Sequence, residues 1–309
     1  MDVVSDAISA VRLGSPSSNR LRVTGSWCTR LAPYDGAGFH VVLEGGCWLL
    51  PDGGGDPVSL GPGDAVLLPH GTGHVLADSP AGPETVARAV PFDLYAGQVG
   101  TDGPGGTELL CGKYRLDRSR VHPLLAELPG IVHLPNRIGS RPELRSAIDL
   151  LGRELAQAGP GSCLAVPSLL DLLLVYLVRA WLAGAAATGA WPAALGDPVT
   201  AAALRALHTD PAAPWTNDRL AAEAGVSRPT LARRFTAQVG RPPMAYLTWW
   251  RLTYAATLLR DTADPLASIA HRVGYAGPYA FSHAFNREFG TTPGRYRTER
   301  RNRPAPAAH

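Results

Sequence analysis

The chain has 309 residues with a formal net charge of +3, and 45% of its residues are hydrophobic. A chain of this length can bury two or three separate cores. Its four cysteines are too widely spaced for a disulfide framework. Its first ten residues include Asp2 and Asp6 and lack the basic and then apolar pattern of a secretory signal. We therefore expect a cytoplasmic protein with reduced thiols.

The charge is unevenly distributed along the chain. Residues 197–309 carry 15 arginines against 8 acidic residues, a balance of +7, whereas residues 1–196 have a balance of −4. A basic carboxyl-terminal third beside an acidic amino-terminal part is typical of a nucleic-acid-binding module joined to a domain of another kind.

Residues 20–115 read as short strands separated by turns. Apolar runs at 39–43, 47–50 and 65–68 are divided by segments rich in glycine and proline at 52–56 and 61–64. Many short strands with such punctuation predict a β-sandwich or a β-barrel.

Helical periodicity begins near Arg141, and a more apolar helix is expected over 168–182. Asp171 and Arg179 interrupt the second helix, and its apolar core is shorter than the ~20 residues that a bilayer span needs. We therefore expect this helix to be buried, including against a second copy of the chain, and expect no membrane as a partner. The alanine- and glycine-rich segment 184–198 is expected to be a linker.

Residues 220–235 and 269–289 each read as a short helix, a glycine turn and a second helix. The turns fall at Gly225 and Gly274, where glycine would adopt a left-handed conformation without steric cost. A long helix over 244–260 lies between the two motifs and would hold them about 34 Å apart, the pitch of double-stranded DNA.

The second helix of each motif has an apolar face that should point inward, formed by Leu231 with Phe235 and by Phe281 with Phe285. The first of these helices leaves arginines and a threonine facing outward: Arg228, Thr230, Arg233 and Arg234. Arginines on a helix are usually only a solvated face. Two copies of the motif in a basic segment favour insertion into the DNA major groove instead.

The most specific text of this region is Ile269-Ala270-x-x-Val273-Gly274-Tyr275 and Phe285-x-Arg287-Glu288-Phe289-Gly290-x-x-Pro293-x-x-Tyr296-Arg297. With it, residues 198–298 resemble the AraC/XylS family of bacterial transcription regulators. The resemblance implies two helix-turn-helix units in successive major-groove turns on one face of double-stranded DNA. Carried onto this chain, the family's reading positions are Arg228, Pro229, Ala232 and Arg233, then Pro278, Tyr279, Ser282 and His283.

Two positions depart from the family pattern, because many members have arginine at His283 and a basic residue is common at Asn286. A neutral imidazole cannot make the bidentate contact of arginine with guanine. We therefore expect Arg233 and its helix to carry more of the sequence reading. The second helix, Asn286 included, is expected to contribute mainly phosphate contacts.

Residues 38–78 resemble the cupin barrels that are joined to many of these regulators. The second cupin motif is matched by Gly63, Pro69, Gly71 and His74. The first motif is partial: His40 and Glu44 have its spacing, but Gly38 replaces its first histidine. The resemblance implies a site at His40, Glu44 and His74 that binds either a small effector or a divalent metal with an open position. A hydrogen-bonded core histidine is the alternative, and no cofactor is certain.

A second kind of sensing chemistry would use cysteine. The stretch Leu110-Cys111-Gly112-x-Tyr114-Arg115-Leu116 resembles a cupin-bearing subgroup that includes a reactive-chlorine sensor, and Cys111 matches one of that sensor's redox cysteines. The sensor's other cysteine precedes the aligned tryptophan, whereas Cys28 follows Trp27, so the pair is not reproduced. The alternative is that these cysteines are buried and inert, as we expect for Cys47 and Cys163.

These observations predict a multidomain α and β protein: a cupin-like jelly-roll barrel at 1–135, a helical dimerisation region and linker at 136–197, and an all-α DNA-binding domain at 198–309. The predicted function is that of a DNA-binding transcription regulator, not an enzyme, whose barrel senses a small ligand or an oxidant. A homodimer that activates transcription with RNA polymerase is the working expectation. The alternative is a metal-dependent cupin dioxygenase or isomerase with a helical appendage.

Overall fold

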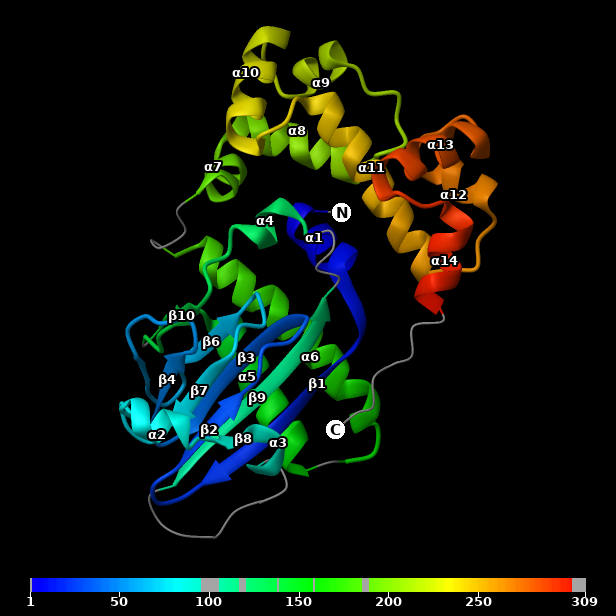
Figure 1. Ribbon diagram of the computed structural model, residues 1–309. Coiled ribbons are helices and arrows are strands. Elements are labelled where there is room, and N and C mark those ends of the chain that lie inside the picture. The colour runs from blue at the N-terminus through cyan, green and yellow to red at the C-terminus, as the bar shows by residue number, and fades with distance from the viewer. Residues whose placement is uncertain are drawn as a thin grey trace. The chain divides into compact units, whose positions relative to one another are not determined.

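The structure of the chain is a computed structural model that describes residues 2–95, 106–116, 121–137, 139–157, 159–184 and 189–301 (Figure 1). These residues form two compact units. The barrel unit consists of the described residues between 11 and 121 and between 128 and 184. The helical unit consists of 189–301 together with two short segments from earlier in the chain, 2–10 and 122–127.

The barrel unit contains two five-stranded sheets, which confirms the jelly-roll prediction. The first sheet has the order β1-β9-β3-β6-β10 and the second the order β5-β4-β7-β2-β8. The strands of the first sheet are β1 (Arg12–Val23), β9 (Thr107–Leu116), β3 (Gly36–Glu44), β6 (Ala65–Leu68) and β10 (Val132–Leu134). Those of the second are β5 (Val58–Leu60), β4 (Cys47–Pro51), β7 (His74–Ala77), β2 (Cys28–Leu31) and β8 (Val90–Pro91). Short helices α2 (Pro83–Ala87) and α3 (Phe92–Tyr95) lie on either side of β8 in the sequence.

Side chains from both sheets form the core of the barrel unit. Leu109 and Cys111 of β9 pack in one buried cluster with Leu49 of β4 and Leu76 of β7. Because alternate residues of a strand point to opposite faces, residues 109 and 111 both face this core. The core therefore places Cys111 inside the barrel.

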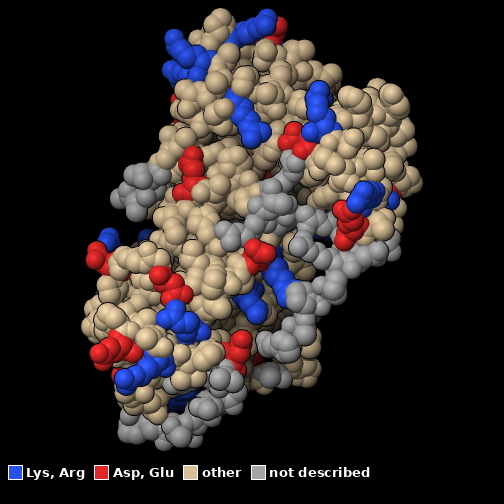
Figure 2. All heavy atoms as spheres, in the orientation of Figure 1, with Lys and Arg blue, Asp and Glu red and all other residues tan. Residues whose placement is uncertain are grey.

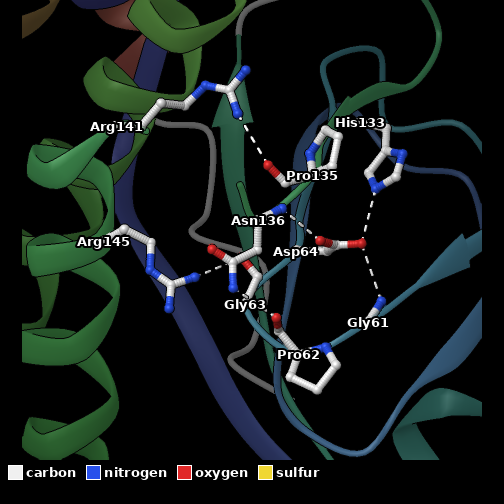
Figure 3. Close-up of polar contacts among 9 residues, drawn as sticks. All are labelled: Gly61, Pro62, Gly63, Asp64, His133, Pro135, Asn136, Arg141 and Arg145. Carbon is white, nitrogen blue, oxygen red and sulfur yellow. Dashed lines mark hydrogen bonds and ion pairs between the residues drawn. The ribbon is translucent and has the colours of Figure 1, made fainter. Parts of the chain in front are cut away.

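A polar clamp joins the turn before β6 to the end of β10 (Figure 3). The carboxylate of Asp64 accepts hydrogen bonds from the backbone N–H of Gly61 at 3.1 Å, from the backbone N–H of Asn136 at 2.7 Å and from Nε2 of His133 at 3.2 Å. Arg145 of α5 donates to the carbonyl of Gly63 at 3.3 Å. The clamp therefore fixes the start of the second cupin motif against the helices that follow the barrel.

Two long helices, α5 (Pro142–Gln157) and α6 (Ser162–Leu182), pack on each other and on β1. Tyr114 of β9 donates a hydrogen bond of 2.6 Å to the carbonyl of Leu170, which ties α6 to the sheet. Helix α6 begins six residues earlier than the predicted helix at 168–182. At this length, and by composition, it could cross a membrane. Core helices pass the same test, and Leu173, Leu177 and other residues of α6 are buried.

The helical unit contains α4 (Pro123–Ala126), α7 (Ala190–Gly196), α8 (Pro198–Thr209), α9 (Asn217–Glu223), α10 (Arg228–Val239), α11 (Pro243–Asp261), α12 (Leu266–Arg272), α13 (Pro278–Phe289) and α14 (Pro293–Arg301). Helix α7 lies within the segment predicted to be a linker. It forms because Trp191 and Ala194 bury their side chains as α7 packs against α8 and α10. Residues 190–196 are thus a packed helix, and residues 185–188 of the predicted linker lie outside the described residues.

The first residues of the chain also differ from the sequence interpretation, which assigned them to the barrel domain. They form α1 (Val3–Val11), and its residues up to Ala10 belong to the helical unit. Val3, Ala7 and Val11 are buried, and their spacing of four residues puts them on one face of α1.

Candidate nucleic-acid interface and sensor site

The first helix-turn-helix motif consists of α9, a turn at Gly225, and α10. The hydroxyl of Thr216 caps α9 by accepting a hydrogen bond of 3.1 Å from the backbone N–H of Arg219. Gly225 has a φ of +67°, the left-handed conformation predicted for it. Leu231 and Phe235 of α10 are completely buried. The inward and outward faces of α10 are therefore those expected from the sequence.

The second motif repeats this arrangement with α12, a turn at Gly274, and α13. Gly274 has a φ of +82°. Phe281 and Phe285 are completely buried, with ring centroids 5.6 Å apart in an edge-to-face contact. Helix α11, with 19 residues, connects the two motifs as one stiff element. The two motifs thus share one local design.

The residues expected to contact DNA lie on the surfaces of α10 and α13. The exposed ones are Arg228, Pro229, Arg233 and Arg234 on α10, and Pro278, Tyr279, His283 and Asn286 on α13. Thr230, Ala232 and Ser282 are partly exposed. Tyr279 is 87% exposed, more than any other large hydrophobic residue that the structure describes. An apolar ring held in solvent at the start of a helix is suited to contact a partner.

The three arginines of α10 differ in their partners. Arg228 lies 3.7 Å from the carboxylate of Asp218, and Arg234 lies 3.3 Å from that of Asp197. Asp197 also caps α8 by accepting from the backbone N–H of Thr200 at 2.8 Å, and this hydrogen bond lowers the pKa of the Asp197 carboxyl. Arg233 is exposed and has no ion pair with any residue in the described part of the chain. Of the three, Arg233 has the guanidinium that DNA can engage without breaking an ion pair.

The two reading helices also differ in charge. Helix α10 carries three arginines and no acidic residue, whereas α13 carries Arg287 together with Glu288. Figure 2 shows arginine atoms gathered at the top of the view, over α9 and α10. Helix α10 therefore attracts phosphate more strongly than α13 does.

In the barrel, His40 contacts both His74, expected at the effector or metal site, and Cys111, expected as a redox cysteine. His40 and Cys111 are directly opposite one another in the β3–β9 pair, with Nδ1 of His40 3.0 Å from Sγ of Cys111. On the other side of the ring, Nε2 of His40 lies 2.7 Å from Nε2 of His74. All three side chains are buried.

The protons of this thiol–imidazole chain have one consistent assignment. Nδ1 of His74 lies 3.0 Å from the carbonyl of Thr72, which can only accept, so this nitrogen carries a proton and Nε2 of a neutral His74 accepts from His40. Nδ1 of His40 then accepts from the thiol of Cys111. Burial lowers the pKa of both imidazoles, which keeps them neutral.

Glu44 does not join these residues. Its side chain is 64% exposed and lies 3.8 Å from Arg22. Among the described residues, no group of three histidine, cysteine or acidic side chains could hold a metal ion. The structure thus brings together His40 and His74 of the expected triad, with Cys111 in place of Glu44.

The four cysteines differ in environment, and Cys163 is exposed on α6, so the expectation that it is buried is wrong. Cys47 and Cys111 belong to the same buried core cluster, and burial raises the pKa of the Cys47 thiol to about 12 and that of Cys111 further. Cys28 is partly exposed on β2, and burial also raises its pKa. The expected pair of Cys28 and Cys111 is therefore divided between the two sheets, and Cys47 is the cysteine that shares the core with Cys111.

A buried polar cluster in the helical unit had no counterpart in the sequence interpretation. It contains Asp6, His122, His208 and Tyr246. The apolar spacing of Val3 and Ala7 was a signal for α1. No local pattern could have paired Asp6 with His208, which is 202 residues away in the sequence.

Comparisons with known proteins bear on both units. The cupin family profile matches residues 2–183, and a helix-turn-helix domain profile matches residues 220–299. A protein of Streptomyces antibioticus named as an AraC-like transcription regulator is 37% identical over 303 residues, which cover 96% of this chain and 98% of the relative. The chain belongs to the AraC-like transcription regulators.

Two further proteins are similar to this regulator. The RCS-specific transcriptional activator RclR of Escherichia coli is 31% identical over 262 residues, covering 84% of this chain and 83% of RclR. The solved DNA-binding domain of the transcriptional factor AdpA, in complex with a target DNA, is 31% identical and covers 36% of this chain and 99% of that domain, with a TM-score of 0.33. The two profile matches and the relative from Streptomyces antibioticus identify the regulator as a cupin protein with a helix-turn-helix domain of the AraC type, and the alternative of a cupin enzyme is set aside.

Proposed function

We propose that this regulator binds specific sequences of double-stranded DNA as a cytoplasmic homodimer and activates transcription through contact with RNA polymerase. Helix α10 reads bases mainly through Arg233, and α13 adds contacts from Tyr279 and His283. A small ligand or an oxidant received in the barrel changes the DNA affinity.

The observation that carries the DNA-binding proposal is the state of Arg233. Its side chain is exposed and has no ion pair among the described residues, while the same helix is anchored inward by completely buried Leu231 and Phe235. A guanidinium on a rigid helix presents two parallel donors, and this geometry matches the O6 and N7 acceptors of guanine.

The thiol–imidazole chain supports the barrel as the receiving site. A buried thiol with a proton acceptor at 3.0 Å can lose its proton as its sulfur attacks an oxidant, although burial alone disfavours the thiolate. The sequence relationship to an RCS-specific activator favours an oxidant over other signals. A small ligand that hydrogen-bonds to His40 or His74 is the second candidate.

Genome-wide footprinting of the tagged protein, with and without hypochlorite, tests this function. We expect a small set of protected sites that share a repeated sequence and whose occupancy changes with hypochlorite. The tagged Arg233→Ala variant should lose these sites. Absence of shared sites for the wild-type protein would refute sequence-specific binding, whereas unchanged occupancy under hypochlorite would refute only the oxidant signal.

A further inference from the structure

Two segments from the amino-terminal half of the chain are built into the helical unit. Helix α1 buries Val3, Ala7 and Ile8 there. Arg260 of α11 donates hydrogen bonds of 3.3 Å to the carbonyls of Ser9 and Ala10, which are among the last carbonyls of α1. The second segment, 122–126, includes α4, and its residues His122 and Leu124 are completely buried.

A chain of hydrogen bonds joins both segments to α8 and α11, the helices that precede and follow the first helix-turn-helix motif. Oδ2 of Asp6 lies 2.8 Å from Nδ1 of His208 on α8, and Nε2 of His208 lies 2.8 Å from the hydroxyl of Tyr246 on α11. The same hydroxyl lies 3.3 Å from Nε2 of His122. Asp6 and His208 have side chains that are 2% and 0% exposed, so water cannot replace either partner.

The donors and acceptors of this chain run in one direction. Nδ1 of His122 accepts from the backbone N–H of Leu124 at 3.1 Å, so the proton of the neutral ring is on Nε2 and is donated to the Tyr246 oxygen. The Tyr246 hydroxyl then donates to His208, and His208 donates to Asp6. Burial lowers the pKa of His122 and raises that of Tyr246, which keeps both groups in the required neutral forms. Each group in the chain has the partner that its neighbours require.

The hydrogen-bonded residues support α10 from its buried side through Tyr246. The ring of Tyr246 packs edge to face against Phe235 of α10, with centroids 5.7 Å apart. Phe235 faces inward while Arg233 faces solvent, so these contacts leave the reading surface uncovered. Tyr246 is thus a positioning residue for α10, through which the two segments bear on the reading helix.

Both segments lie close in the sequence to strands of the sensor barrel. Helix α1 ends one residue before β1, and segment 122–126 begins six residues after β9 ends. At these ends the strands are paired, because Arg12 is opposite Leu116. Strand β9 also carries Cys111. A change of the β1–β9 pair therefore acts on the strand end that follows α1 and on the strand end that precedes residue 122 by six residues.

We propose that α1 and residues 122–126 form a latch that holds α10 in its DNA-reading position, and that the barrel regulates DNA affinity by loosening this latch. The proposal rests on the proposed function, and it names the elements through which the regulation acts. When α1 and residues 122–126 are docked, they hold α10 through Tyr246 and Phe235 and leave Arg233 exposed, so the docked state is the one that binds DNA.

Variants of the full chain test the latch. Tyr246→Phe removes the hydroxyl and keeps the ring against Phe235, and Asp6→Leu removes the acceptor for His208. Asp6→Asn retains an acceptor oxygen and serves as the conservative variant. Asp149→Leu, at an exposed position of α5, is the control. If Asp6→Leu fails to fold, Tyr246→Phe carries the test alone.

Hydrogen exchange followed by mass spectrometry, and affinity for a DNA fragment located by footprinting, are the two measurements. We expect Tyr246→Phe and Asp6→Leu to raise exchange in 122–126 and α10, to leave β3 and β6 unchanged, and to weaken DNA binding about tenfold. Asp6→Asn should stay close to the wild type. Unchanged exchange in α10 with unchanged affinity would overturn the latch while wild-type DNA binding still stands.

A barrel variant tests the regulatory half of the proposal. His40→Gln changes the thiol–imidazole chain without touching the helical unit. We expect it to raise exchange in 122–126 and α10 and to lower DNA affinity in the same direction as Tyr246→Phe. If exchange in these segments stayed at the wild-type level, the barrel would not act through the latch.

Discussion

The Nδ1 atom of His40 lies 3.0 Å from the Sγ atom of Cys111 within the buried core of the barrel unit. Burial raises the pKa of the Cys111 thiol, so few molecules hold a thiolate at neutral pH, and oxidation depends on His40 as the acceptor of the thiol proton. We therefore predict that His40→Gln slows conversion of Cys111 to sulfenic acid by hydrogen peroxide, a reaction that also yields water.

Mass spectrometry after trapping the sulfenic acid with dimedone measures this rate. Cys163, which is exposed, is an internal control and should be labelled equally in both proteins. Equal labelling of Cys111 in the wild type and in His40→Gln would show that the imidazole does not assist the thiol.

Replacing Arg233 with alanine should weaken binding to the specific site by about 1–3 kcal/mol and relax the base preference at one position. Arg205→Ala removes the same charge from an exposed position of α8 and is the matched control. Fluorescence anisotropy on a set of single-base variants of the site measures both effects. His283→Ala should change the base preference less, and a larger effect there would assign the main reading role to α13.

The two turn glycines should respond differently to alanine. Gly225 has open space around its α-carbon, so Gly225→Ala should cost only the strain of a left-handed residue, about 1 kcal/mol. At Gly274 the new methyl would lie 2.8 Å from Cζ of Arg251 and 2.9 Å from Cα of Ala212, and Arg251 is held by the carbonyl of Pro211 at 2.6 Å. Gly274→Ala should therefore cost about 2–3 kcal/mol. Urea unfolding of both variants measures the two losses in the free energy of unfolding. A greater loss for Gly225→Ala than for Gly274→Ala would contradict this prediction.

Three buried histidines should make the protein less stable in mild acid. Burial lowers the pKa of His40, His74 and His122 below the ordinary value of 6.5. Below pH 6.5 the unfolded chain therefore binds protons that the folded chain does not, and the free energy of unfolding falls by up to about 1.4 kcal/mol per pH unit for each histidine.

Urea unfolding between pH 8 and pH 5 measures this dependence. Exposed His271 and His283 can be replaced with glutamine as controls, and the slope should remain the same. A free energy of unfolding that stays constant from pH 7 to pH 5 would contradict neutral, buried imidazoles.

The homodimer should depend on the outer face of α6. Leu164 is 78% exposed and Leu172 is 39% exposed, so α6 presents apolar side chains to solvent. Replacing both with glutamate should shift the protein from dimer to monomer in sedimentation velocity, because two charges would face a second copy. Val90→Glu, at another exposed apolar position of the barrel unit, should leave the association unchanged. A double variant that remains dimeric would place the contact elsewhere.

Much of the DNA-binding unit could be predicted because its signals are local. Leu231 and Phe235 share a face through helical spacing alone, and Gly225 and Gly274 occupy left-handed turns because other residues are strained there. The short strands of the barrel were also predicted, since turn residues and apolar runs alternate along the chain. The sequence by itself therefore determined the fold class and the exposed arginines of α10.

The composition of the sensor site and of the latch was decided only by the tertiary structure. Cys111 meets His40 because the register of β3 and β9 places them opposite one another, and a shift of one strand by one residue would put the two side chains on opposite faces of the sheet. Asp6 meets His208 because helices far apart in the sequence pack into one core. Periodicity says which residues become buried, but the partners of a buried polar group depend on strand register and helix docking, which arise only when the whole chain folds.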